Sequence, residues 1–394
     1  MKKAKTSLSV DQIETIRDRV MKSIAPLTPA SRSQSNEFGA TPTNAGNRLP
    51  PYYLVYFLLV ELLKFPHTGR EEKVAWTIPV DYRGSCAWIQ HQKMGLGVFS
   101  TATEDSELVA QQIVNAIQRG VTAATPFFDH LASEAAAGSK LNVRNNSVWL
   151  LSRYEYLREQ FREKATSAEA RKGDVVKTEK TSSDGTKSES YSFPALALKQ
   201  EAAWLGVAAI DAFFSWTEHV LIHIAVLRGR LKTGEDVAEL AAANWSEKVK
   251  AAIGLDDGAL KPLVDELLAV RRQIRNYLAH GAFGKQGEAF KFHSRAGAVP
   301  VNMTDTDGRN RFSIWFGESF DEAGAIDTAD RFAKRLWDGD LAPAKIYIQN
   351  AGLPIILPYA TDGTYERAMA SVEDMKCLVA SLTREMDNAA NMDW

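Results

Sequence analysis

The chain has 394 residues, of which 45% are hydrophobic and 24% charged, and a formal net charge of −2. This composition excludes a disordered chain. The nearly balanced charge excludes a global basic field for nucleic acid, so any RNA contact must come from a local patch. The two cysteines, Cys86 and Cys377, form no spaced motif. We therefore expect neither a disulfide framework nor a zinc site. A cytoplasmic location is expected instead.

The first 64 residues are predicted to hold two helices joined by a linker. Ser9 and Gln12 match a capping box, and apolar residues follow at helical spacing up to Ile24. Residues 27–51 are rich in Pro, Ser, Thr, Asn and Gly, which is typical of linkers. Residues 52–64 form an apolar run that predicts a buried helix. The run is far shorter than the roughly 20 residues of a membrane span, so no membrane association is expected.

A β-hairpin and a helical stretch are predicted next. Residues 73–80 and 87–91 are rich in β-branched and aromatic side chains, and residues 81–84 between them have the composition of a turn. Pro79 has no backbone N–H to donate, which predicts that the first of these strands lies at the edge of its sheet. Residues 104–135 are expected to be helical.

Amphipathic helices dominate the middle of the chain. Residues 146–165 and 196–230 carry apolar side chains at helical spacing and predict two long helices that could be antiparallel neighbours. Residues 165–192 have almost no large apolar groups. Two interpretations stay open for them: a disordered insertion, or an exposed polar ribbon that turns at Asp184–Gly185. A shorter helix is expected around residues 238–253.

The last third is predicted to begin with a helix whose apolar stripe runs from Leu263 to Leu278. Gly281 suits the C′ position of that helix. Two strands and then two helices are expected to follow it: 289–293, 311–316, 320–337 and 364–388. Six tryptophans are interpreted as core residues: Trp76, Trp88, Trp149, Trp204, Trp216 and Trp245.

Three polar side chains suited to phosphodiester chemistry lie close together near the end of this helix: Arg275, Asn276 and His280. A neutral imidazole near pH 7 can accept the proton of an RNA 2′-hydroxyl. A guanidinium can hold the phosphate and stabilise the charge that develops on it. This chemistry needs no metal and no cofactor. The competing interpretation is structural, because Arg and His in the last turn of a helix complement its dipole.

Helix geometry constrains how these residues can act together. A helix advances about 100° per residue, so His280 lies roughly 140° round from Arg275, whereas Asn276 and His280 share one side. For Arg275 and His280 to act on one phosphate, the last turn must loosen at Gly281, or two copies of the chain must face each other. The second arrangement predicts a composite site in a homodimer.

The segment from Arg275 to His280 resembles the signature of the HEPN superfamily, which is Arg, a polar residue, three more residues and then His. The resemblance covers roughly residues 145–300. It implies a helical bundle with the motif late on a helix, and a metal-independent endoribonuclease that dimerises with its motifs apposed. The resemblance implies that Arg275 and His280 are the catalytic pair. It also implies that Asn276 occupies the polar position beside the arginine. Members of the superfamily occur in toxins, phage defence and RNA processing, and some have lost catalysis.

Four residues of the long helix at 196–230 are secondary candidates. Asp211 and Glu218, seven apart, could receive Arg271 or the motif arginine, and a partly buried ion pair that supports the site is favoured over direct catalysis. His219 and His223, four apart, have a spacing that can hold a metal. No third ligand is near them in sequence, so they are expected to be surface or subunit-contact histidines.

Basic residues follow the motif at Lys285, Lys291 and Arg295. They are interpreted either as a solvated strand and loop or as a patch that follows an RNA backbone.

Together these patterns predict a mainly α protein, an HEPN-like helical bundle with small β-hairpin additions. Residues 1–50 are expected to form an N-terminal helix and linker, and residues 51–144 an α/β accessory region. Residues 145–300 are expected to form the HEPN-like bundle with a polar insertion at 165–192, and residues 301–394 a C-terminal strand with helices. The expected function is metal-independent RNA cleavage in a toxin, phage-defence or stress-response system. RNA, a second copy and a regulatory protein are the expected partners. The alternative is a non-catalytic helical interaction or regulatory module.

Overall fold

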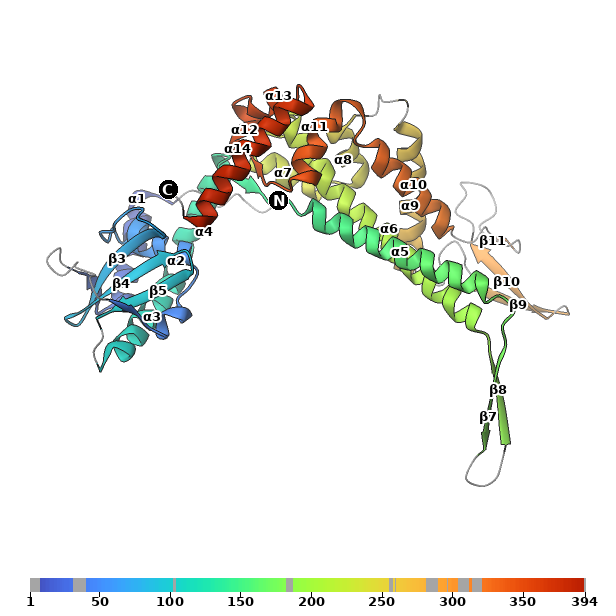
Figure 1. Ribbon diagram of the computed structural model, residues 1–394, viewed down its shortest axis with the longest axis horizontal. Helices are drawn as coiled ribbons and strands as arrows, with labels where there is room; N and C mark the ends of the chain where they lie inside the picture. The colour runs from blue at the N-terminus through green and yellow to red at the C-terminus, as the bar shows by residue number, and fades with distance from the viewer. Residues whose placement is uncertain are drawn as a thin grey trace. The chain divides into compact units, whose positions relative to one another are not determined.

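The computed structural model forms two compact units (Figure 1), Met1–Leu141 with Ala380–Trp394 and Asn142–Val379. We call them unit 1 and unit 2. The structure describes these residues: 8–30, 40–101, 104–181, 187–254, 258, 260–280, 290–295, 297–303, 312–313 and 321–392. For 275–280, 290, 291, 300, 302, 303, 312 and 313 it describes the backbone alone.

Unit 1 is built on a five-stranded antiparallel sheet, and its strands in spatial order are β1 (Leu27–Pro29), β3 (Val74–Tyr82), β4 (Ser85–Gln92), β5 (Gly95–Ser100) and β2 (Thr41–Pro42). The predicted hairpin is confirmed. Arg83 and Gly84 connect β3 to β4, and their φ angles of 56° and 86° are those that a two-residue type I′ turn requires.

Two predictions about this sheet are wrong. The predicted linker at 27–51 contains both edge strands, β1 and β2, and the 3₁₀ turn η2 (Ala45–Arg48). β3 is not an edge strand, since it pairs with β1 as well as β4. Pro79 is tolerated there because the β1 ladder ends opposite Val80, where Ala30 N–H donates to the Pro79 carbonyl.

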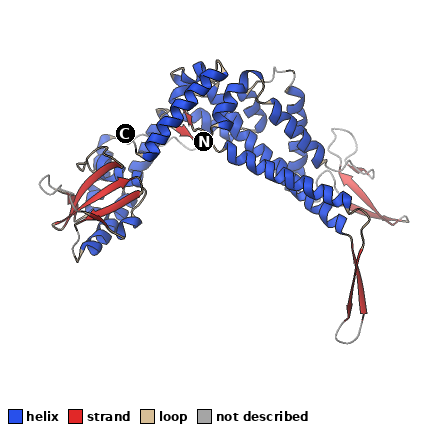
Figure 2. Cartoon of the chain, viewed as in Figure 1, coloured by secondary structure: helices blue, strands red, loops and turns tan. Residues whose placement is uncertain are grey.

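The helices of unit 1 pack with the sheet around one apolar core (Figure 2). They are α1 (Val10–Ile24), α2 (Tyr52–Tyr56), the π-helical turn η3 (Phe57–Leu62), α3 (Ser106–Ala123) and α4 (Thr125–Ala137). The predicted capping box is confirmed: Ser9 Oγ accepts from Gln12 N–H, and the Gln12 side chain accepts from Ser9 N–H. The helical predictions at 52–64 and 104–135 are also confirmed, with a break at Ala124, just before Pro126.

Unit 2 is organised around α5 (Ser147–Ala170) and α6 (Pro194–Leu227), which pack along each other over much of their length. The polar segment between them is an antiparallel ribbon of β7 (Val176–Thr181) and β8 (Lys187–Ser192), and every residue of both strands is exposed. Of the two interpretations left open, the ribbon is therefore correct. The turn predicted at Asp184–Gly185 lies outside the described residues.

The predicted helix at 238–253 is in fact two, α7 (Gly234–Ala242) and α8 (Trp245–Ala252). Asn244 separates them because its side chain caps α8 in a capping box with Glu247. α8 packs on α6, as does α10 (Glu322–Arg335), and α10 also contacts α9 (Lys261–His280).

The rest of unit 2 consists of short elements. β9 (Phe290–Ser294), β10 (Gly297–Met303) and β11 (Phe312–Ser313) form a small sheet in which β10, which was not predicted, is central. The helix predicted at 364–388 is divided into α13 (Thr364–Ala368) and α14 (Val372–Asn391), whose start Ser371 caps. The remaining elements are β6 (Asn142–Val143), η5 (Gly339–Leu341), α11 (Ala342–Lys345), η6 (Ile346–Asn350), β12 (Ile355–Ile356) and α12 (Pro358–Thr361).

The protein is mainly helical with small antiparallel sheets, as predicted. α6 alone among the described helices has the length and apolar content of a membrane span. Of its most apolar stretch of 18 residues, 61% is buried within the protein. The helical spacing of apolar residues in this segment predicts one shared face, and the six residues that form it are all buried: Val207, Ile210, Phe214, Thr217, Leu221 and Ile224.

Candidate functional site

The three motif residues Arg275, Asn276 and His280 occupy the last turns of α9, whose backbone is helical through His280. Their side chains lie outside the described residues, so their mutual distances stay a prediction. Lys285 also lies outside the described residues, as does the side chain of Lys291. Arg295 is exposed, in the turn after β9. What the structure does describe is the ionic cluster one turn before the motif.

Glu218 of α6 is the centre of this cluster. Its Oε1 accepts from Arg271 Nη2 of α9 at 2.6 Å, and its Oε2 accepts from Lys248 Nζ of α8 at 2.7 Å. The Lys248 side chain is only 3% exposed, compared with 29% for Glu218 and 38% for Arg271. One carboxylate therefore ties three helices together through two cations.

The protonation of Glu218 follows from its partners. Burial by itself raises the pKa of this carboxyl, but hydrogen bonds from Lys248 and Arg271 outweigh burial, and the net pKa is lowered. Glu218 is therefore ionised at neutral pH. The cluster of two cations and one anion carries a net positive charge, and a positive charge beside α9 favours a phosphate over a cationic ligand.

Arg271 is held from a second direction by an aromatic ring. Its guanidinium carbon lies 5.2 Å from the centroid of the Phe214 ring, in cation–π range. Its Nη1 is buried and has no hydrogen-bond partner among the described residues. Arg275 follows Arg271 by four residues, so its Cα lies on the same side of α9, one turn further along. The cluster therefore fixes the part of α9 that leads into the motif.

α9 is also fixed by α10 on another side. Glu266 Oε2 accepts from Thr328 Oγ1 at 3.0 Å and from Arg331 Nη2 at 2.9 Å. The predicted apolar stripe of α9 is buried at Leu267 and Ile274. Polar contacts and apolar burial together hold this helix within the bundle up to the start of the motif.

The other predicted supporting residue, Asp211, is exposed on α6, two turns before Glu218. Of the two acidic residues, Glu218 therefore makes the partly buried ion pair with Arg271, which was one of the two arginines considered as its partner. The structure does not bring Asp211 into that cluster.

His219 and His223 were expected to be surface or subunit-contact residues, and a surface position is wrong for His223, which is only 1% exposed, whereas His219 is half-buried. Their rings lie 4.2 Å apart, and His219 Nε2 accepts from the backbone N–H of Asn146 at 2.9 Å. Burial and the neighbouring His223 lower the pKa of His219 to about 3, and burial lowers that of His223 to about 4. Among the described residues, no group of three or more His, Cys, Asp or Glu side chains is placed to hold a metal.

The sequence interpretation missed Lys248 and misplaced two tryptophans. Lys248 lies between Trp245 and Val249 on the buried side of α8, and a lysine inside an apolar stripe was a signal that could have identified it. Trp149 and Trp204, interpreted as core residues, are 66% and 60% exposed, whereas the other four of the six tryptophans are buried.

Comparisons of the chain with protein-family models, with curated proteins and with solved structures found no match.

Proposed function

We propose that the chain is a metal-independent endoribonuclease of the HEPN type. The observation that carries this proposal is the order Arg275, Asn276, His280 on the last turns of α9, directly after a cluster of net positive charge at Arg271, Lys248 and Glu218. Positive charge that is already in place beside the reacting phosphate stabilises the transition state without reorganisation.

In the proposed reaction, His280 accepts the proton of an RNA 2′-hydroxyl. The 2′-oxygen then forms a bond to the adjacent phosphorus, and the bond from phosphorus to the 5′-oxygen of the next nucleotide breaks. That 5′-oxygen takes up a proton, so the products are a 2′,3′-cyclic phosphate and a 5′-hydroxyl end. Arg275 holds the phosphate and stabilises the extra charge on it, and Asn276 orients the scissile group.

We further propose that two copies of the chain supply one reactive centre. Arg275 and His280 lie roughly 140° apart around α9, and a helix cannot present both to one phosphate without opening its last turn. Facing copies bring the arginine of one chain to the histidine of the other. Because uncontrolled cleavage would harm the host cell, we also expect a regulatory partner, and residues 1–144 are the part proposed to sense or restrain.

The test incubates purified full-length protein with total RNA in the presence of EDTA. Wild type is expected to cleave RNA and leave cyclic phosphate ends, whereas Arg275→Ala and His280→Ala are each expected to reduce the rate at least about 100-fold, because general acid–base and charge-stabilising groups contribute on that scale. Arg272→Ala is the matched control, since Arg272 is an exposed arginine on the same helix. It should retain wild-type cleavage.

Equal cleavage by wild type and both motif variants would mean that the nuclease resides elsewhere or is a contaminant. Cleavage that disappears with EDTA would contradict the metal-independent mechanism.

A second candidate function is a non-catalytic module that assembles with partners. The observation that favours it is the exposure of large apolar side chains on α5 and α6, including Trp149, Tyr156 and Trp204. Exposed aromatic residues are enriched in protein interfaces. Under this alternative, RNA stays intact, and Trp149→Ala weakens a partner complex while Arg275→Ala has no effect.

A further inference from the structure

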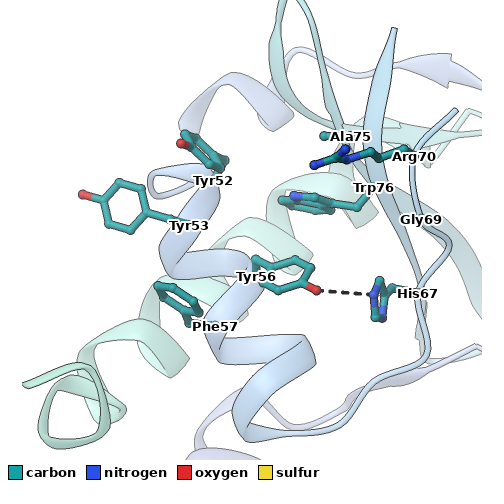
Figure 3. Close-up of a pocket in the computed structure, with 9 residues that line it drawn as sticks. All are labelled: Tyr52, Tyr53, Tyr56, Phe57, His67, Gly69, Arg70, Ala75 and Trp76. Atoms are coloured by element: carbon teal, nitrogen blue, oxygen red, sulfur yellow. Dashed lines mark hydrogen bonds between the residues drawn. The ribbon is translucent and has the colours of Figure 1, made fainter. Parts of the chain in front are cut away.

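Unit 1 contains an open pocket of about 520 Å³ that the sequence interpretation did not identify. One wall is formed by α2 and the start of η3, with Tyr52, Tyr53, Tyr56 and Phe57. The other is formed by the loop before β3 and by β3 itself, in the range 67–76 (Figure 3). A volume of this size suits a small organic ligand or a single residue of a polymer.

Aromatic rings of the two walls contact one another. The Tyr56 ring lies 5.5 Å from both the His67 and the Trp76 rings, and Tyr56 OH is 3.4 Å from His67 Nε2. The Tyr52 ring stacks on His91 at 4.2 Å with an interplanar angle of 9°. Contacts between neighbouring rings fix their orientation, so a planar ligand would meet surfaces that are already in place.

These rings are not fully covered by the protein. Tyr52 and Tyr53 are 49% and 48% exposed, although exposing a large aromatic side chain sacrifices favourable burial. Figure 3 shows Tyr53 directed away from the other rings, whereas Tyr56 and Trp76 lie between the two walls. The accessible aromatic surface therefore belongs mainly to Tyr52 and Tyr56, with the edge of Trp76 beside them.

The charge at the pocket favours an anion. The lining residues that the structure describes include Arg70 and no Asp or Glu. A guanidinium has five N–H donors, so it can bind a phosphate while it keeps a contact within the protein. Burial lowers the pKa of His91, which leaves a neutral imidazole behind the Tyr52 ring at pH 7. Of the described residues in the lining, Arg70 alone belongs to the types Lys, Arg, Asp and Glu.

We propose that this pocket binds a nucleotide, with the base stacked on Tyr52 and Tyr56 and the phosphate held by Arg70. Stacking on aromatic rings combined with a guanidinium for phosphate is the chemistry by which single nucleotides and single-stranded RNA are held. The ligand is a free nucleotide or one nucleotide of an RNA strand. The inference does not depend on the proposed cleavage, because it concerns binding in the other unit.

Two other ligands fit less well. A methylated ammonium also binds among aromatic rings, but the arginine in this lining would repel it. A proline-rich peptide docks on aromatic grooves through apolar contact and needs no anion site, so it leaves Arg70 without a role.

The test is calorimetric titration of full-length protein with adenosine monophosphate, adenosine, ribose 5-phosphate and a short single-stranded RNA. The RNA is added to His280→Ala protein so that cleavage cannot consume it. We expect adenosine monophosphate to bind at least about tenfold more tightly than adenosine or ribose 5-phosphate, because it alone uses both the ring wall and the arginine. Binding of the RNA but not of the monophosphate would also support the site and assign the polymer as its ligand.

Variants locate the binding. Arg70→Gln should weaken the phosphate-bearing ligand about tenfold and leave adenosine unchanged, whereas Tyr52→Ala should weaken both. Arg19→Gln, at an exposed arginine on α1, and Tyr191→Leu, at an exposed tyrosine on β8, are the matched controls and should bind as wild type does.

Three outcomes would overturn the proposal. The first is that wild type binds none of the four ligands. The second is that Arg70→Gln binds the monophosphate as tightly as wild type does. The third is that a proline-rich peptide binds the pocket while nucleotides do not, which would assign it to a protein partner.

Discussion

The Lys248 side chain has almost no access to water, and its Nζ donates to the carboxylate of Glu218. Removing one partner of a buried pair leaves an uncompensated charge, which costs more than the pair itself contributes. We predict that Glu218→Gln lowers the free energy of unfolding by about 3 kcal/mol. Urea unfolding followed by tryptophan fluorescence measures this change.

Two further variants test the cause of that loss. Asp211→Asn, at an exposed position on the same helix, should change the free energy of unfolding by less than about 0.5 kcal/mol. Lys248→Met removes the buried charge itself and should cost less than Glu218→Gln. A Glu218→Gln protein as stable as the Asp211→Asn protein would show that the cluster does not stabilise the bundle.

The histidine pair predicts a pH dependence of stability. The pKa values of His219 and His223 are depressed to about 3 and about 4 in the folded protein, so between these values and about 6.5 the unfolded chain binds protons that the folded chain does not. The stability that depends on keeping these two histidines neutral is therefore fully present above pH 6.5 and is lost progressively as the pH falls below it. The slope should reach up to about 1.4 kcal/mol per pH unit for each histidine.

Urea unfolding at pH values from 7.5 to 5 measures this slope above the range in which most carboxyl groups titrate. Replacing both histidines with glutamine should flatten it. A slope that persists in the double variant would assign the effect to other groups.

At the scale of single residues, the sequence predicted which side chains form an ion pair better than it predicted which side chains are buried. Glu218 was considered as a partner of Arg271 because their helices were expected to pack, and the ion pair is present. The burial of His223 was not predicted, because the face of α6 that carries it looked polar in isolation. The segment that leads into α5 lies against these histidines, since Asn146 N–H donates to His219 Nε2, and only the tertiary packing reveals this contact.

Among the elements, the ribbon of β7 and β8 contributes least to the core. All its described residues are exposed, and the ion pairs that Lys177 makes among the described residues, to Glu179 and Glu189, stay within the ribbon. We predict that replacing residues 172–192 with a short Gly/Ser loop changes the free energy of unfolding by less than about 1 kcal/mol, because loop length alters closure entropy slowly.

Thermal unfolding and far-ultraviolet circular dichroism of the deletion protein measure this effect. A loss of helical signal larger than that of the ribbon region would show that the ribbon is needed to form the α5–α6 hairpin. An RNA-cleavage or partner-binding assay on the same protein then reports any functional role of the ribbon separately from stability.

Long periodic elements were predictable, whereas several short ones were not. α1, α5, α6 and α9 carry apolar stripes over several turns, which a sequence shows directly. β1, β2 and β10 have seven residues or fewer and owe their state to the strand beside them. The division of α7 from α8 depends on one side chain, Asn244, whose capping role competes with a continuous helical pattern.

At the scale of the whole molecule, unit 2 has a core of its own. The largest buried rings of unit 2, including Phe213, Trp216, Trp245 and Phe332, contact one another within that unit. We predict that residues 142–379 produced alone fold cooperatively, with a sharp urea transition of tryptophan fluorescence. A broad transition, or strong binding of a hydrophobic dye, would contradict this independence.

The pattern of apolar residues indicates a mainly helical protein, but it cannot show which residues share a unit. α14 is one continuous amphipathic helix, yet residues up to Val379 belong to unit 2 and those from Ala380 to unit 1. Contacts far apart in the sequence decide this: Lys73 donates to the Asn391 carbonyl and Lys93 to its side-chain amide oxygen. No local pattern encodes such pairs.

Unit 1 is consequently assembled from segments that leave the ribosome at very different times. Residues 8–141 emerge first, and all of unit 2 must be made before Asn391 can reach Lys73 and Lys93. At ordinary rates of translation this delay is roughly 10–50 s, far longer than most small domains need to fold. During that interval every nascent chain holds residues 8–141 without the contacts that Asn391 makes to Lys73 and Lys93, and a chaperone that bound at these positions would have time to act.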